Sequence, residues 1–300
     1  GFEGASVDFK AEPTGGEATI AIDQGAVVLP GVFEEARLPL DSFRGRLRWR
    51  RQGERIDATL DDARLANADA AGTVQASWHT GDPATSASRS RFPGVLDLSA
   101  TLERADLTRV HRYLPLSVPP EARHYVRDAV RAGHSEAVSF RVQGDLWQVP
   151  FDTPGSSGTF RIAGPLKALD FDYLPASLQA SGDAPWPGLR GASGQFVLDR
   201  DTITIDGLKT GIAGLGGVSV APAKVIIEHM GQGTTVKASL RASGPGAELL
   251  KFVQASPLND MTSKALASAR LGGVAQVDVN LTLPVMNLPT STVRGAVQLE

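Results

Sequence analysis

The stretch VAQVDVNLTL, residues 274–283, decides the fold class because apolar and polar side chains alternate along it. Val277, Val279, Leu281 and Leu283 share one parity, and Asp, Asn and Thr stand between them. A period of two is typical of an antiparallel strand with one apolar and one hydrated face. This stretch therefore predicts a strand whose two faces have different surroundings.

The same alternation recurs along most of the chain. It is clearest in four further sets of residues: Leu96, Leu98, Ala100 and Leu102; Phe140, Val142 and Leu146; Ile203 and Ile205; Val225 and Ile227. Clusters of Gly, Pro, Asn and Asp separate these runs and supply turn chemistry. The sequence predicts a mainly β protein, a long antiparallel sheet curled into a groove or trough, built of repeated units with short helical inserts. We expect roughly 18–20 strands, which would span about 90 Å at about 4.8 Å per strand.

Two helical inserts are predicted, at about residues 106–132 and 246–271. In the first, Pro119 and Pro120 suit the opening turn of a helix, and Gly133 can end it. Its predicted apolar face is Ala122, Val126, Ala129 and Val130, with Arg123 on another face. In the second, Asn259 is expected to cap a helix that carries Met261, Ala265, Leu266 and Ala269 and stops at Gly272–Gly273, after a turn in GAELLKFV.

The two inserts resemble each other. YLPLSVPPEARHYVRDAVRAG (113–133) and FVQASPLNDMTSKALASARLG (252–272) align without a gap at a shift of 139 residues, since 252 − 113 = 139. Repeats of this kind indicate stacked units that bury surface against each other. We predict a first unit at residues 1–150, a second at 151–287, and the first strand of a further unit at 288–300. Strand-like alternation at both ends predicts a piece of a longer polypeptide.

Composition and motifs argue against several functions. The net charge is −3 with no basic run, and aromatic residues make up 6%, which disfavours nucleic-acid binding. The absence of cysteine is compatible with an oxidising compartment. The five histidines lack metal-ligand spacing. The carboxylates in LDD (60–62) and LDRD (198–201), and the glycines in GASG (191–194) and GLGG (214–217), are interpreted as turn residues. We expect no cofactor, no metal site and no enzymatic activity.

The apolar strand face has two interpretations. It can be the filled core between two sheets, or it can line a trough for apolar ligands. A large apolar side chain left in water costs about 1.5–3 kcal/mol relative to burial, so a trough must be narrow, capped or filled. An acyl chain would fill it, gaining about 0.8 kcal/mol for each CH₂ removed from water.

The order of elements around the first insert resembles a known family. ADLTRVHRYLP, EARHYVRDAVRAG and AVSFRVQGDLWQVPF follow one another as in the central periplasmic region of the YhdP / AsmA-like family, and IDGLKTGIAGLGGVSV resembles a strand-turn-strand element of the wider superfamily. The resemblance implies a periplasmic β-groove in a protein of the Gram-negative envelope. It also implies an inner-membrane anchor outside this chain, contacts with outer-membrane components and movement of phospholipid towards the outer membrane. It supplies no catalytic residues.

The leading hypothesis is a monomeric segment of a periplasmic bridge that carries phospholipid between the inner and outer membranes. Its partners would be phospholipid acyl chains and not nucleic acid. The alternative is a structural or adhesive β-repeat scaffold of the envelope without lipid cargo. The residues expected to line the groove are Phe140, Val142, Leu146, Ile203, Ile205, Val225, Ile227, Val277, Val279 and Leu281.

Overall fold

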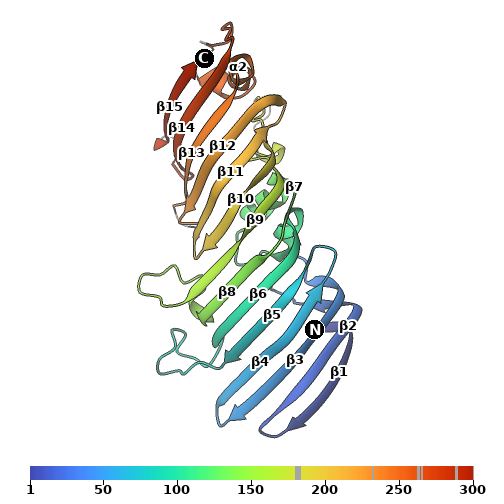
Figure 1. Ribbon diagram of the computed structural model, residues 1–300. Helices are drawn as coiled ribbons and strands as arrows, with labels where there is room; N and C mark the ends of the chain where they lie inside the picture. The colour runs from blue at the N-terminus through green and yellow to red at the C-terminus, as the bar shows by residue number, and fades with distance from the viewer. Residues whose placement is uncertain (180–183, 232, 262–263, 265, 288–289, 300) are drawn as a thin grey trace.

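The fold is one long antiparallel sheet, seen in a computed structural model of the chain (Figure 1). The structure describes residues 1–179, 184–231, 233–261, 264, 266–287 and 290–299. The strands are β1 (Phe2–Glu12), β2 (Gly15–Val28), β3 (Arg37–Gln52), β4 (Arg55–Ala66), β5 (Ala70–His79), β6 (Val95–Asp106), β7 (Val130–Ser135), β8 (Val138–Asp145), β9 (Thr159–Phe171), β10 (Leu189–Asp199), β11 (Thr202–Ile212), β12 (Leu215–Glu228), β13 (Thr235–Pro245), β14 (Val274–Pro284) and β15 (Thr292–Leu299).

The mainly β, antiparallel class predicted from the alternation is confirmed. The strands follow one another in chain order, except that β7 and β8 share one place in the sheet, both between β6 and β9. The described residues form 15 strands, so the expected 18–20 was too high. The estimate was high because it divided the chain into shorter strands than the structure has; β3 alone has 16 residues.

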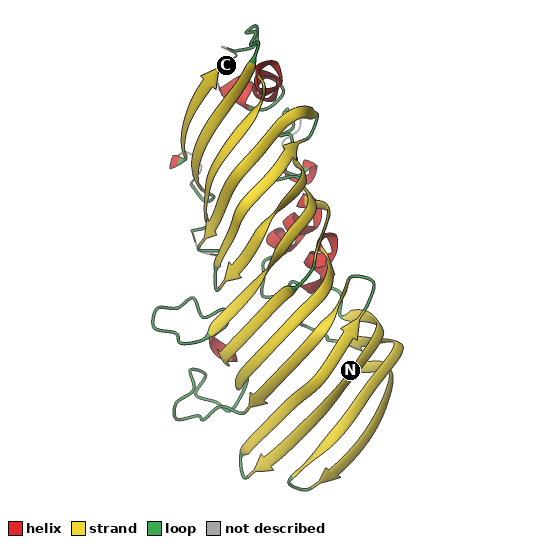
Figure 2. Ribbon diagram, viewed as in Figure 1, coloured by secondary structure: helices red, strands yellow, loops and turns green. Residues whose placement is uncertain are grey.

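Helical segments lie mostly along one long edge of the sheet, and the longer loops lie along the opposite edge (Figure 2). We call these the helix edge and the loop edge. The segments are η1 (Leu107–Tyr113), α1 (Pro120–Ala129), η2 (Leu146–Gln148), η3 (Ala176–Leu178), α2 (Gly246–Gln254) and α3 (Leu258–Met261). Of these, η2 is at the loop edge, because it follows the end of β8 there.

Both helical inserts are excursions between two strands that pair with each other. The first lies between β6 and β8, and the second between β13 and β14. The predicted limits need correction. In the first insert, α1 ends at Ala129 and residues 130–132 are already strand β7, because the chain rejoins the sheet there and pairs with β9. The unit boundaries at 150/151 and 287/288 stay a prediction.

The second insert also differs from its prediction. GAELLKFV forms the helix α2, longer than a single turn, and α3 is only four residues long. Residues 264 and 266–268 are turns, so the described part of the predicted Asn259–Ala269 helix does not continue to Ala269. Ala265 lies outside the described residues. This Ala- and Ser-rich segment has too few large apolar residues to hold a long helix against the sheet edge.

The loop at residues 29–36 holds the first insert against the sheet through hydrogen bonds. Arg123 is buried and donates to Glu34, and the backbone N–H of Leu116 donates to the carbonyl of Val32 over 2.8 Å. The predicted face of α1 was therefore wrong at two positions: Ala122 is exposed, and Arg123 is turned inward. The reason is tertiary, since the partner Glu34 comes from a loop 89 residues earlier.

A half-buried polar network holds η1 beside the loop at residues 29–36. The guanidinium of Arg112 lies 2.5 Å from Asp69 and 2.8 Å from Glu35, and Tyr113 donates to Asp69 over 2.9 Å. The amide of Asn67 donates to the Tyr113 hydroxyl over 2.9 Å. Burial raises the pKa of Tyr113, so it remains a hydroxyl donor at physiological pH. The network joins segments up to 77 residues apart and anchors the insert at the helix edge.

Removing the Asp69 carboxylate should destabilise the chain. We expect Asp69→Ala to cost about 3 kcal/mol of unfolding free energy, because Arg112 and Tyr113 lose a partner where little water replaces it. The matched control is Asp61→Ala, whose exposed pair with Arg48 should cost less than about 1 kcal/mol. Urea unfolding followed by circular dichroism measures both. Equal losses would show that the network does not anchor the insert.

β-Bulges bend the strands and curl the sheet. Gly4, Gln24, Asp62, Gly191 and Gly207 have positive φ inside their strands, and the register with a neighbouring strand shifts at each of them. A bulge adds a residue to one strand and bends it locally. Two motifs that were interpreted as turn residues lie at such bulges. LDD (60–62) and GASG (191–194) lie inside β4 and β10 at bulges, and are not turns between strands.

Candidate functional site

On one face of the sheet, apolar side chains of strands from β3 to β14 pair directly and form continuous rows. Directly paired residues form a first row, Leu47–Leu60–Ala76–Leu98–Val142–Phe160, which crosses six strands. A second row, Ala100–Phe140–Ile162–Leu198–Ile203–Ile227–Val236–Leu283, crosses eight. The rows lie side by side on β6, β8 and β9, where Leu98 precedes Ala100 by two residues.

Every member of these two rows is partly exposed. We call the 14 residues the open strip. It runs from β3 to β14 over ten strand spacings, about 48 Å at about 4.8 Å each. Among the described residues there is one sheet, so no second sheet packs on this face as it would in a sandwich.

Towards the helix edge the same face is closed. On β9, Phe160 and Ile162 are half-buried, whereas Leu166 and Leu169 are buried. Leu166 and Leu169 belong to one buried cluster. Its other members come from β10, β11 and β12: Ala192, Leu208, Val220 and Ala223. Leu107 and Val130 from the first insert pack against it. The bent strands and the insert together fill this half of the face.

The structure places nine of the ten sequence candidates on the apolar face. Phe140, Val142, Ile203 and Ile227 lie in the open strip. The remaining five belong to neighbouring rows and are also half-buried: Ile205, Val225, Val277, Val279 and Leu281. Ile205 and Val225 additionally pack against the buried cluster. Their role in lipid binding stays a prediction.

Leu146 needs correction. It lies in η2, after β8 has ended at Asp145, and its backbone N–H donates to the carbonyl of Gly94 over 3.0 Å. The alternation continues to Leu146, but the strand ends at Asp145. Asp145 ends the strand because its carboxylate accepts from the backbone N–H of Trp147, which starts the turn.

Sequence reasoning missed several members of the strip. Leu47, Leu60 and Leu98 were not nominated, nor were Phe160, Ile162 and Leu198. Leu98 was visible in an alternating run, but Arg stands among the apolar residues of β3, β4 and β9, and β3 and β9 also carry Gly, which obscured the pattern. Register with a clearly alternating neighbour was the signal that could have found them.

The charged groups are arranged away from this strip. Arg141 of β8 points to the other face and pairs with Asp97 of β6, as Arg48 pairs with Asp61. Among the described residues no three His, Asp or Glu side chains are grouped so that they could hold a metal ion. No helix in the described part of the chain is long and apolar enough to cross a membrane. What the site offers is apolar contact.

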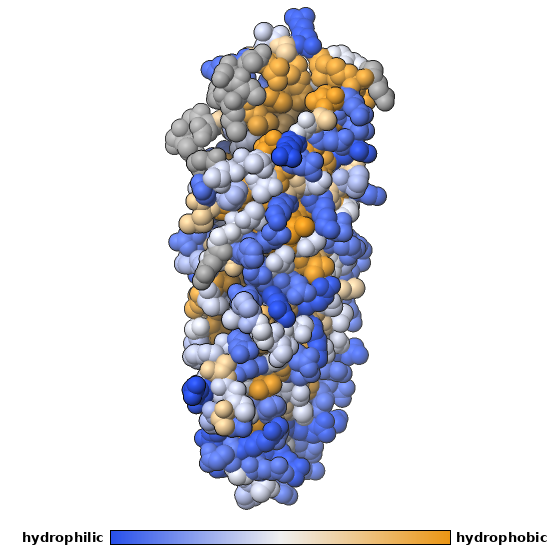
Figure 3. Space-filling model, turned by 90° about the vertical axis from the view of Figure 1, so that its left-hand side faces the viewer, coloured by the Kyte–Doolittle hydropathy of each residue, from blue (hydrophilic) through white to orange (hydrophobic). Residues whose placement is uncertain are grey.

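Figure 3 shows hydrophobic residues gathered at the C-terminal end of the molecule, with smaller hydrophobic areas between hydrophilic ones farther along. Large apolar areas open to water on a folded protein usually mark a binding site.

The chain belongs to the YhdP family: the family model described as "YhdP protein" matches residues 1–300. Comparison with curated proteins gives no significant match, and comparison with solved structures gives none either. Membership of the YhdP family indicates an envelope protein related to lipid transport. The family is not a known enzyme family.

Proposed function

We propose that this chain is a segment of a periplasmic bridge that conducts phospholipid between the inner and outer membranes, with acyl chains lying on the open strip. The observation that carries the proposal is the continuity of 14 half-exposed apolar residues across a sheet with one layer. In this proposal the chain acts as a monomer within an inner-membrane-anchored envelope protein that hands lipid to outer-membrane components.

The energetics favour an acyl occupant. Burying apolar area yields about 25 cal/mol for each Å², on the strip and on the ligand alike. An acyl chain gains about 0.8 kcal/mol for every CH₂ it removes from water, and it can slide because the hydrophobic effect has no preferred direction. A continuous strip lets one part of a tail leave a residue as the next part arrives.

Photo-crosslinking in cells tests this assignment. A photoreactive residue in place of Ile227 should form phospholipid adducts, and the same residue at Ile226 should form few, because Ile226 pairs with Thr204 and Lys237 on the polar face. Val142 and Arg141 form a second matched pair on β8. Adducts are counted by mass spectrometry of the purified protein. Equal or greater labelling at Ile226 and Arg141 would refute the proposal.

A further inference from the structure

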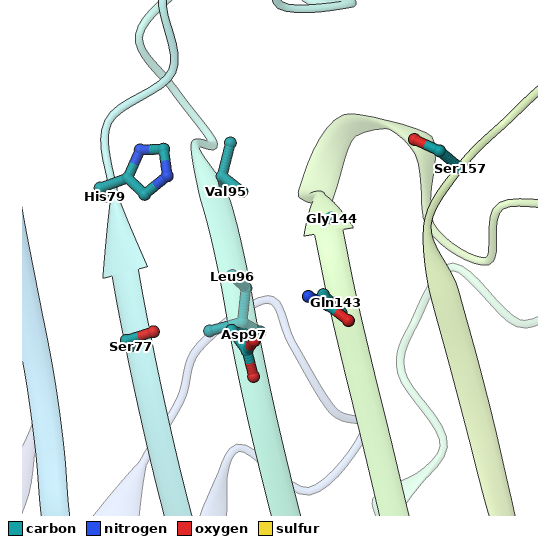
Figure 4. A pocket seen from close by; sticks show the side chains of 8 residues that line it. All are labelled: Ser77, His79, Val95, Leu96, Asp97, Gln143, Gly144 and Ser157. Atoms are coloured by element: carbon teal, nitrogen blue, oxygen red, sulfur yellow. The ribbon is translucent and has the colours of Figure 1, made fainter.

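The polar face of the sheet carries a hollow that the lipid path does not use. It lies near the loop edge over β5, β6 and β8 and is lined by Ser77, His79, Val95, Leu96, Asp97, Gln143, Gly144 and Ser157 (Figure 4). A second hollow adjoins it beneath the loop at residues 80–94 and shares His79 and Val95. Together they form an elongated depression on the face opposite the open strip.

The floor of the hollow is a small grid set by strand register. Ser77, Asp97 and Gln143 are direct neighbours across three strands, and His79, Val95 and Asp145 form the next row. Directly opposed side chains lie about 5 Å apart, so the grid is about 10 Å wide. Val95 gives its centre one apolar surface.

The charges around the grid are already compensated. Asp97 accepts two bonds from Arg141, Asp145 accepts from the backbone N–H groups of Ala87 and Trp147, and Glu54 pairs with Arg91 at the rim. Arg55, in the second hollow, pairs with Asp57. No uncompensated cation faces the hollow from the residues that line it, so it offers little to an anion such as a phosphate.

Several neutral hydrogen-bonding groups remain available. Within the described chain the hydroxyls of Ser77 and Ser157 have no protein partner, and the amide nitrogen of Gln143 has none. His79 places Nδ1 2.9 Å from the Thr80 carbonyl, to which it can donate, and in that neutral tautomer Nε2 is an acceptor. Donor and acceptor groups thus lie around the apolar Val95.

We propose that this hollow binds a neutral sugar chain. Hydroxyl groups both donate and accept, as the free Ser, Gln and His atoms require, and the C–H face of a sugar ring can lie on Val95. Two sugar rings in a row fit an elongated site better than one small ion does. The site would attach the lipid-carrying segment to a glycan without blocking the opposite face.

Ligand-observed saturation-transfer NMR on the whole chain tests the proposal, with maltotriose and N-acetylglucosamine trimer as probes and inorganic phosphate as the anionic comparison. We expect at least one sugar to bind at millimolar concentration. The double variant Ser77→Val with Gln143→Leu should weaken that binding by roughly tenfold or more. The matched control, Ser239→Val with Gln195→Leu, alters the same residue types on the same face, away from the hollow, and should leave binding unchanged.

Each outcome decides the question. Circular dichroism first establishes that both double variants are folded; if Ser77→Val with Gln143→Leu does not fold, Ser157→Val replaces it. Absence of binding by both sugars, unchanged binding in the hollow variant, or phosphate competing for the same signal would overturn the proposal. Lipid crosslinking at Ile227 is independent of these results, so failure here leaves the proposed lipid function standing.

Discussion

Replacing Ile203 by aspartate is expected to abolish phospholipid carriage while leaving the sheet folded. Ile203 lies in the second row of the open strip, between Leu198 and Ile227. An acyl chain that crosses this point must remove water from the new carboxylate, which costs several kcal/mol. Because every 1.36 kcal/mol is a tenfold change in rate, passage should fall by roughly 100-fold or more. Folding should survive, because a carboxylate at this half-exposed position can stay hydrated.

The control for this variant is Thr204→Asp, one residue along β11. Thr204 pairs with Val197 and Ile226 on the polar face, so its carboxylate never meets the lipid path. Native mass spectrometry measures phospholipid retained by each purified variant, and complementation in cells measures transport. If Ile203→Asp keeps as much lipid as the control, the strip is not the path. If neither the native chain nor the control retains lipid, the envelope-scaffold alternative is favoured.

Truncating Phe151 should produce the largest loss of stability in the chain. Its side chain is fully buried, and its ring covers Gly144 and Gly158: a Cβ on Gly158 would lie 2.1 Å from Phe151 Cδ1. We expect Phe151→Ala to cost about 3–5 kcal/mol, because the ring leaves a cavity against two glycines that have no side chain to fill it.

Trp147→Ala is the matched comparison, four residues earlier in the same loop. This side chain is 65% exposed, so its truncation should change the unfolding free energy by no more than about 0.5 kcal/mol. Thermal and urea unfolding of both variants give the comparison. Similar losses for the two would mean that the loop is not held by the Phe151 ring.

The sequence was sufficient for the class of fold and for the direction of most side chains. Alternation along β14 predicted an antiparallel strand with Val277, Val279 and Leu281 on one face, and the register places them there. Period two arises from local backbone geometry, which is why it survives without tertiary information. The same locality explains the errors. Leu146 continued the parity but not the strand, and Arg123 was placed off the inward face of α1 because its partner Glu34 is distant in sequence.

What the sequence alone determined is a series of strands with one apolar face, two helical excursions and membership of a recognisable family. Only the tertiary structure decided which part of that face is covered. Ile203 and Leu208 stand five residues apart, so strict alternation would put them on opposite faces, but a bulge at Gly207 adds a residue to β11 and brings them to the same face. Ile203 is half-exposed there, whereas Leu208 is buried in the cluster. The segments that cover the apolar face are far apart in the chain, so the pattern of one strand does not show which residues they bury. The polar hollow likewise forms only when three strands pair in register.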